Sequence, residues 1–258
     1  MTKQPRPRHI RDIAHLYLSR RQGGARAVVS VAVTSSRREC FGGLHVANLA
    51  VAFARRKLDV RLYELSGTLP NASFYLAHPP RLYLGTRAWG QDTFHPALAG
   101  VSLTFETAPP PAGGSGRPQV HLIHLPALSS GDELWGALER AEGLRTADRW
   151  TLLVHDAGGA DAAAARRLGR RIEPQRAFTM TVGGPGPCPV PGVEHLGGLG
   201  VWKPLVVDRV PVVLRNPQAR ASLEYLSICD SLLSRMNGNA RRNRAQDTGV
   251  SAGHPAGG

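Results

Sequence analysis

The groups of this sequence that could do chemistry are concentrated in residues 28–71, where apolar runs alternate with short polar loops. The apolar run 27–33 predicts a buried strand, and the loop after it contains Arg37. Gly42 and Gly43 then open a helical pattern, and a second strand ends near Glu64. Because a helix N-terminus offers free N–H groups to anions, this order of elements is typical of a phosphate-binding site.

The spacing of these groups resembles the deviant-Walker ATPases of the MinD/ParA type. Their motif is a hydrophobic strand, then T-S-G-K-G-G-V-G-K-T-T, three further residues and N-L-A. Here Thr34-Ser35 and Asn48-Leu49-Ala50 stand at the two ends with the same spacing and no gap. The resemblance places Arg37 at the signature lysine, Gly42 at the phosphate-loop lysine and Gly43 at the metal-binding threonine.

The residues inside the loop depart from that motif in ways that bear on phosphate binding. Arg38, Glu39 and Phe41 replace glycines, although glycines let the backbone bend so that its N–H groups converge on phosphate. Gly42 supplies no cation for the terminal phosphates, and Gly43 has no hydroxyl for Mg²⁺. Arg37 alone keeps the charge of the residue it replaces.

Two later positions show the same loss. After the second strand the family carries an acidic pattern, of which this chain keeps Glu64 but has Ser66 in place of the other carboxylate. The strand at 120–125 ends in His124 where the family has an aspartate, with Pro126 retained. Histidine is a poor ligand for Mg²⁺, because hard cations prefer oxygen.

The end of the body extends the resemblance. The stretch PVVLRNPQARASLEYLSICDSLL resembles the last strand and helix of the branch of this family that regulates flagellar number. The resemblance therefore covers roughly residues 28–236. It implies a P-loop NTPase-like fold, a degenerate nucleotide site that comprises Arg37, Gly42, Gly43 and Glu64, and a homodimer as an open possibility.

The net charge of +13 belongs mostly to the two ends of the chain. Residues 1–26 carry seven basic side chains against one acidic, and residues 235–258 carry four against one. Such arms can contact acidic proteins, nucleic-acid backbones or lipid head groups. Residues 9–21 also show apolar side chains at helical spacing, which predicts an amphipathic helix that could contact a protein partner.

Other classes of site and location are disfavoured. The three cysteines are widely separated, so neither a zinc site nor a disulfide framework is expected. His121 and His124 are expected on opposite faces of one strand, so we predict no metal site and nominate no catalytic residue. No apolar stretch resembles a signal peptide or a membrane span, and we expect a cytoplasmic protein.

Strand and helix patterns alternate along the body. This alternation predicts an α/β fold of three layers, with a mostly parallel sheet and helices on both faces. We expect a basic arm at 1–26, one domain at 27–236 and a disordered polar tail at 237–258. Strands are expected at 27–33, 60–65, 101–106, 120–125, 151–156, 177–182 and 205–213, and helices at 9–21, 44–57, 131–145, 160–171 and 218–236.

The interpretation favoured by these observations is a pseudo-ATPase, which keeps the MinD/ParA-like scaffold, needs no cofactor and regulates or scaffolds by binding a protein partner. One alternative is a working MinD/ParA-type ATP hydrolase with a rebuilt loop, in which Arg37 replaces lysine and ATP and Mg²⁺ are bound. A second alternative is a positioning module that binds nucleic acid through the basic arms, with an affinity that falls steeply with salt.

Overall fold

The computed structural model describes residues 28–67, 69–76, 101–104, 119–142, 149–156, 168–170, 172, 176–184, 190, 192–200 and 210–249. The expected basic arm at 1–26, with its helix at 9–21, lies outside these residues. So do most of the expected helix at 160–171 and the last part of the expected tail.

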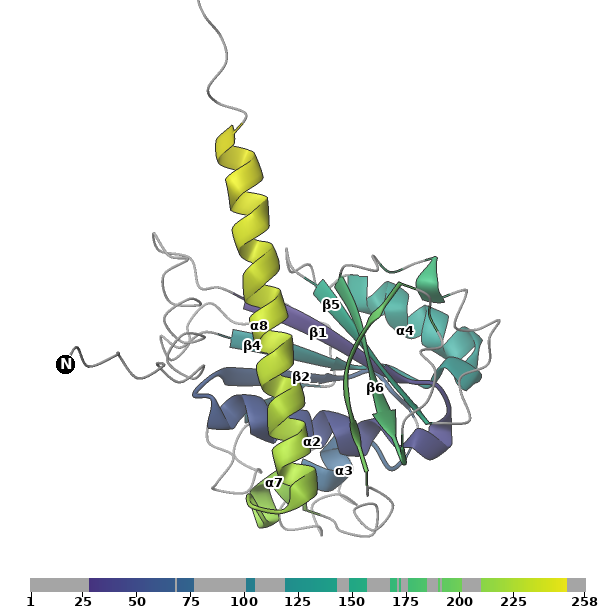
Figure 1. The fold of residues 1–258 in the computed structure, drawn as a ribbon. Coiled ribbons are helices and arrows are strands. Elements are labelled where there is room, and N and C mark those ends of the chain that lie inside the picture. The colour runs from purple at the N-terminus through teal and green to yellow at the C-terminus, as the bar shows by residue number, and fades with distance from the viewer. Residues whose placement is uncertain are drawn as a thin grey trace, which may run out of the picture.

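Seven strands form one sheet in the order β3-β2-β4-β1-β5-β6-β7, and every pairing in it is parallel (Figure 1). The first strand of the chain lies in the middle of the sheet, and the chain crosses over on both sides of it. The strands are β1 (Val28–Ser35), β2 (Asp59–Glu64), β3 (Val101–Thr104), β4 (Gln119–His124), β5 (Arg149–Asp156), β6 (Ala177–Val182) and β7 (Glu194–Leu199).

Helices cover both faces of this sheet, so the fold has three layers. The α-helices are α2 (Gly42–Arg55), α3 (Ala72–Leu76), α4 (Asp132–Glu142), α7 (Val212–Arg215) and α8 (Arg220–Gly249). Figure 1 shows α2 and α8 on one side of the sheet and α4 on the other. The predicted three-layer α/β architecture is confirmed, and the sheet is parallel throughout the part that the structure describes.

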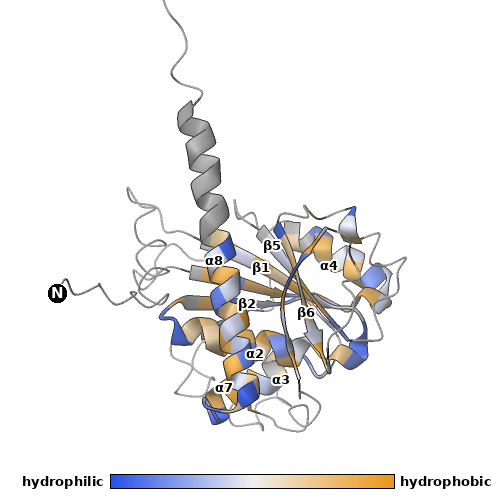
Figure 2. Ribbon diagram, in the orientation of Figure 1, coloured by the Kyte–Doolittle hydropathy of each residue, from blue (hydrophilic) through white to orange (hydrophobic). Residues whose placement is uncertain are grey.

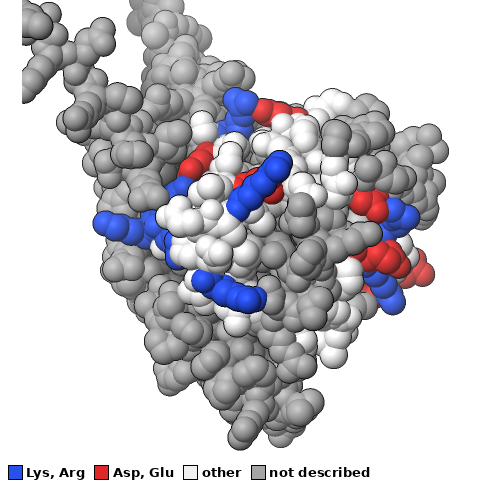
Figure 3. Space-filling view, turned by 60° about the horizontal axis from the view of Figure 1, so that its bottom comes forward, with Lys and Arg blue, Asp and Glu red and all other residues white. Residues whose placement is uncertain are grey.

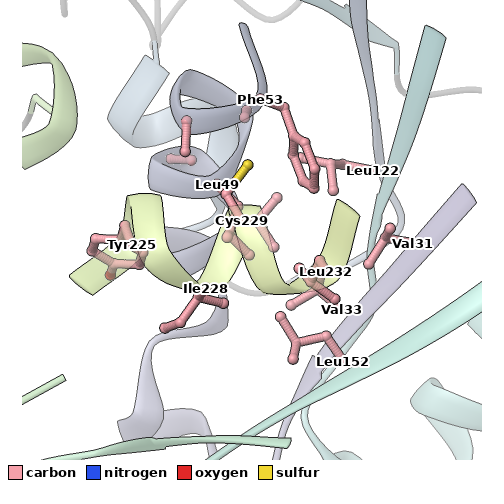
Figure 4. Close-up of a cluster of buried hydrophobic side chains, with 14 of the residues drawn as sticks. Val31, Val33, Leu49, Phe53, Leu122, Leu152, Tyr225, Ile228, Cys229 and Leu232 are labelled. Atoms are coloured by element: carbon pink, nitrogen blue, oxygen red, sulfur yellow. The ribbon is translucent and has the colours of Figure 1, made fainter. Parts of the chain in front are cut away.

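The larger core lies between the sheet and the helices α2 and α8. Every residue of α2 from Gly42 to Phe53 is buried, because the sheet covers one side of the helix and α3, α7 and α8 cover the other. A helix that is apolar all round is expected in such a position, and Figure 2 shows the largely apolar character of α2. Side chains from α2, α8 and six of the strands meet in this core, and Figure 4 shows part of it.

The smaller core lies on the opposite face, between the sheet and α4. Ile123 from β4 and Leu153 from β5, the strands on either side of β1, pack there with Leu134 and Leu138 from α4. Burial of a leucine or isoleucine side chain stabilises a fold by about 2 kcal/mol. The two cores therefore hold the strands from both faces and fix where their carboxyl ends lie.

Four details differ from the sequence-based expectations. Val212 and Val213 lie in the short helix α7, although the stretch 205–213 was expected to be extended. The elements α3 and β7 were not predicted. Helix α8 continues to Gly249, so the expected helix end at residue 236 is wrong. A polar composition excludes burial but does not exclude a helix, and alanine and arginine near residue 241 favour one.

Candidate functional site

The carboxyl ends of four neighbouring strands bring polar side chains to one edge of the sheet. Ser35 ends β1, Glu64 ends β2, His124 ends β4 and Asp156 ends β5. Glu64 and His124 are register partners, and His124 pairs with Val33, two residues before Ser35. Because strand side chains alternate between faces, Ser35, Glu64 and His124 lie on the same face, where α2 begins.

The loop between β1 and α2 is closed by hydrogen bonds to the protein itself. Residues Arg38–Cys40 form a single 3-10 turn, η1. The Cys40 amide donates to the Arg37 carbonyl (3.1 Å) and the Phe41 amide to the Arg38 carbonyl (2.9 Å). The Ser36 amide donates to a carbonyl of β5 (2.7 Å). These three N–H groups are therefore directed at the protein and do not converge on a shared anion.

A buried side chain fills the inside of this loop. Cys40 is fully buried in the larger core, and its Sγ atom lies 3.4 Å from the Ser36 hydroxyl. Burial raises the pKa of the Cys40 thiol, so the group stays protonated at neutral pH. Phe41 adopts a left-handed backbone conformation with φ of 50° as the chain enters α2. The loop is thus packed against the protein interior.

The two arginines of the loop form ion pairs with acidic side chains, one at the end of β5 and one in α4. Arg37 pairs with Asp156 at the end of β5, and this hydrogen bond raises the pKa of Arg37. Arg38 lies 3.6 Å from the Glu133 carboxylate and donates to the Ser130 hydroxyl at 3.3 Å. Both arginine side chains are largely exposed, so these contacts orient the side chains more than they stabilise the fold.

A cavity of about 260 Å³ lies beside the start of α2. Of the four predicted site residues, Gly42 and Gly43 line it, whereas Arg37 and Glu64 do not. Its lining residues are Ser35, Arg38, Phe41, Gly42, Gly43, Ser66, Leu69, Pro70, His124, Leu125 and Ala127.

The environment of Gly43 leaves no room for a side chain. A Cβ atom placed on this residue would lie 2.5 Å from the carbonyl carbon of Asn71 and 2.7 Å from its Cα. The chain between β2 and α3 therefore occupies the space into which a threonine would project. At Gly42 a Cβ atom would lie 3.1 Å from His124 Nε2 and 3.4 Å from Ser35 Oγ.

The Glu64 carboxylate is engaged with the protein. One oxygen lies 2.5 Å from His124 Nδ1 and 3.3 Å from the Ser66 amide, and the other accepts from the Ala72 amide at 2.9 Å. Both Glu64 and His124 are buried. The pair holds the ends of β2 and β4 together and fixes the chain that approaches Gly43. His124 and Ser35 were not among the residues predicted for the site, although the register of neighbouring strands could have indicated both.

A second buried histidine links the loop to the last helix. His45 Nε2 donates to the Cys40 carbonyl (2.8 Å), so Nδ1 accepts from the Tyr225 hydroxyl of α8 (2.7 Å). Complete burial lowers the pKa of His45 to about 4 and raises the pKa of Tyr225. Both groups are therefore neutral at pH 7. Through these two hydrogen bonds, His45 connects η1 to α8.

The described residues contain no group of three or more histidine, cysteine, aspartate or glutamate side chains that could hold a metal ion. As predicted, His121 and His124 face opposite sides of β4: His121 contacts the Tyr63 ring, and His124 contacts Glu64. Among the described helices, none combines the length and the apolar character that a membrane span requires.

Together, the central strand, the buried helix after it and the parallel sheet define an α/β fold that is P-loop NTPase-like. Solved structures of MinD share this fold. The MinD cell division protein of Aquifex aeolicus superposes with a TM-score of 0.56 at 14% identity, over 80% of this chain and 97% of that one.

The MinC:MinD cell division protein complex of Aquifex aeolicus contains a chain that superposes with a TM-score of 0.53. It is 14% identical, and the match covers 80% of this chain and 96% of that chain. No family model matches the sequence. No curated protein matches it either. At this level of identity the likeness concerns the fold.

Proposed function

We propose that this protein is a pseudo-ATPase of the MinD/ParA type, which regulates or scaffolds by binding a protein partner and does not hydrolyse nucleotide. The observation that carries the proposal is the contact of the Asn71 backbone with Gly43. In the MinD/ParA-type motif that the sequence resembles, the position of Gly43 is occupied by a threonine whose hydroxyl binds Mg²⁺. A Cβ atom at this position would lie only 2.5 Å from the Asn71 carbonyl carbon, so a threonine side chain with its hydroxyl does not fit there.

The rest of the site supports the same proposal. The loop amides of Ser36, Cys40 and Phe41 bond to the protein, and the Arg37 side chain pairs with Asp156 outside the cavity lining. A phosphate chain with Mg²⁺ needs converging N–H groups, a cation and oxygen ligands. The described residues do not fit this group, and the cavity is smaller than the about 300 Å³ at which pockets for drug-sized ligands begin.

Partner binding is proposed by elimination and by analogy. A MinD protein of the same fold occurs in a complex with MinC. A fold without turnover can still present its surface to a protein. The basic arm at 1–26, with the expected helix 9–21, is the segment that we propose for this contact.

The test of the nucleotide claim is calorimetric titration of the purified full chain with ATP, with and without Mg²⁺, together with a phosphate-release assay. We expect no Mg²⁺-dependent binding and no turnover. Mg²⁺-dependent hydrolysis that is abolished by Arg37→Ala or Glu64→Gln would show a working enzyme and would overturn the proposal.

The partner claim is tested separately. The full chain and a variant that lacks residues 1–26 are cross-linked in cells under identical conditions, and the adducts are compared. We expect a discrete protein adduct that depends on the deleted residues. Nucleic acid as the only cross-linked species, lost at high salt, would favour the nucleic-acid-binding alternative.

A further inference from the structure

A groove of about 690 Å³ lies between α8 and the start of β7, far from the loop that follows β1. Helix α8 borders it from Leu223 to Arg235, and β7 borders it at Glu194–Leu196. Because an α-helix rises about 1.5 Å per residue, the border along α8 is about 18 Å long. The groove is therefore long enough to receive a helix of three to four turns.

The charged side chains of this groove are already paired with one another. Arg56 donates to both oxygens of Asp230, and Arg235 pairs with Glu194. A polyanion would have to break these pairs and leave the carboxylates facing its own charge, so the groove is not suited to nucleic acid. An occupant is selected by its apolar surface and not by its charge.

The part of the lining that is uncovered is apolar or small. Leu223 is 51% exposed, although most large apolar side chains of the described residues are buried. Small side chains let a second helix approach closely, because the distance between packed helices depends on the residues at the contact. These side chains recur along α8 at helical spacing: Leu223, Leu226, Ser227, Ser231 and Ser234.

The expected helix at 9–21 has a matching shape. Its apolar side chains fall on one face, at Ile10, Ile13, Ala14, Tyr17 and Leu18. A helix of this length is about 20 Å long, close to the length of the groove. Isolated helices of fewer than about 12 to 15 residues are marginal in water, so this segment needs a surface to stay helical.

The chain also places this segment within reach of the groove. All strands of the described sheet are parallel, so β1 and β7 begin at the same edge, at Val28 and Glu194. Their starts are three strand spacings apart, which is about 14 Å. The six residues 22–27 can span up to about 20 Å when extended. We propose that helix 9–21 docks into the groove between α8 and β7 of its own chain, through Ile13, Tyr17 and Leu18.

This inference goes beyond the proposed function, because it concerns a different surface and holds whether or not the chain hydrolyses nucleotide. Where both hold, a protein that binds the arm competes with the groove for the same apolar face. The arm would then be covered in the free protein and uncovered for its partner.

The experiment is hydrogen exchange of the purified full chain, measured by mass spectrometry in peptides that cover residues 9–21, at a low and a high protein concentration. We expect these amides to exchange at least about tenfold more slowly than in an unstructured chain, because a docked helix protects its hydrogen bonds. Protection that is equal at both concentrations assigns the groove of the same chain. Protection that appears only at high concentration places the helix on a second copy and overturns the proposal.

Two substitutions remove one side of the contact each. Leu223→Asp puts a charge in the groove, and the first turn of α8 tolerates an acidic residue. Ile13→Asp puts the same charge on the apolar face of the arm, outside the folded body. We expect either one to return residues 9–21 to exchange within about twofold of the unstructured rate.

Each variant has a matched control. Leu69→Asp replaces the other exposed leucine of the described residues, which is 67% exposed and lies away from the groove. Ser19→Asp puts an aspartate on the opposite face of the expected helix. We expect both controls to keep the protection, and circular dichroism checks that every variant is folded. The inference is overturned if residues 9–21 of the unaltered chain exchange as an unstructured chain does, or if Ile13→Asp and a folded Leu223→Asp both retain full protection.

Discussion

The contact between Gly43 and Asn71 is the residue-scale feature with the largest expected effect on stability. Gly43→Ala places a Cβ atom 2.5 Å from backbone that cannot rotate away, so the chain after β2 must shift. We expect the free energy of unfolding to fall by about 2 to 3 kcal/mol, despite the better helix propensity of alanine. Urea denaturation followed by circular dichroism measures it.

Gly42→Ala is the matched comparison for that measurement. Its Cβ atom meets side-chain atoms at 3.1 and 3.4 Å, which small movements relieve. We expect a change within about 1 kcal/mol. Equal effects at the two positions would contradict the assignment of Gly43 as the residue that fixes the neighbouring chain.

The buried Glu64 carboxylate supports a second residue-scale prediction. Glu64→Ala leaves His124 Nδ1 and the Ala72 amide without their partner in a buried site. We expect a loss of about 3 kcal/mol, because removal of one member of a buried pair costs more than the pair contributes. Urea denaturation is again the measurement. Glu64→Gln, which retains an acceptor oxygen, should lose clearly less.

These residues also mark how far sequence reasoning could reach at the site. The motif spacing is sufficient to show that this chain has Gly42 and Gly43 where the motif that it resembles has a lysine and a threonine. The reason why Gly43 leaves no room for a side chain could not be predicted from the sequence. It depends on the backbone at Asn71, which is 28 positions further along the chain. The Glu64–His124 contact was partly predictable. If the order of the two parallel strands is known, their carboxyl ends lie at one edge of the sheet, which brings these residues together.

At the scale of elements, a bidentate ion pair joins the end of α2 to α8. Arg56 Nε and one terminal nitrogen donate to the two Asp230 oxygens at 2.7 and 2.6 Å, and the Arg56 side chain is only 5% exposed. Asp230→Asn removes the charge and one of the two acceptors. We expect it to destabilise the protein by about 2 kcal/mol in thermal or urea unfolding.

The geometry of this pair provides an internal control. Arg56→Lys keeps the charge but cannot make two parallel hydrogen bonds, so we expect it to restore little of the stability that Arg56→Ala loses. Full retention of stability in the lysine variant would show that charge alone joins the two helices.

The elements that sequence patterns predicted well are those buried on both faces. The strands β1, β4, β5 and β6 are rich in apolar and β-branched residues, as expected at the centre of a parallel sheet. The strand β7 has the sequence EHLGGL, with few β-forming residues and with Gly197 at a φ of 141°. It pairs with β6 despite its composition, through a register shift at Thr179. Tertiary packing decided that element, and local propensity did not.

At the scale of the whole molecule, buried neutral histidines make stability depend on pH. Burial lowers the pKa of His45 and of His121 to about 4, whereas the unfolded chain takes up these protons near pH 6.5. The stabilisation from the neutral rings is thus complete above pH 6.5 and is lost as the pH falls toward 4. Between pH 7 and pH 5 we expect each ring to cost about 2 kcal/mol.

The measurement is the free energy of unfolding at half-unit steps from pH 7.5 to 5. His121→Leu is the informative variant, because the Nε2 atom of His121 has no partner among the described residues and the ring is buried against the Tyr63 ring. We expect this variant to show a shallower decline on acidification than the unaltered chain. Parallel curves would assign the pH dependence to other groups.

The distribution of charge over the body bears on the nucleic-acid alternative. Figure 3 shows the described basic side chains of one face scattered singly or beside acidic ones, without a continuous stripe. Ion pairs such as Arg37–Asp156 and Arg235–Glu194 also place basic side chains of the body beside acidic ones. A salt-sensitive contact with a polyanion would therefore depend on residues 1–26 and 235–258, which carry most of the net charge.

The packing of Cys40 inside the loop and of Asn71 against Gly43 also has a consequence for evolution. Under the proposed function, a lineage that descends from this chain could not acquire hydrolysis by one substitution. The side chain of a threonine at position 43 would clash with the Asn71 backbone. A lysine at position 42 would have its Cβ atom close to the side chains of His124 and Ser35. Each single step back lowers stability before it offers any catalytic benefit. Under the proposed function, the absence of hydrolysis is therefore expected to persist, because marginally stable proteins tolerate few destabilising intermediates.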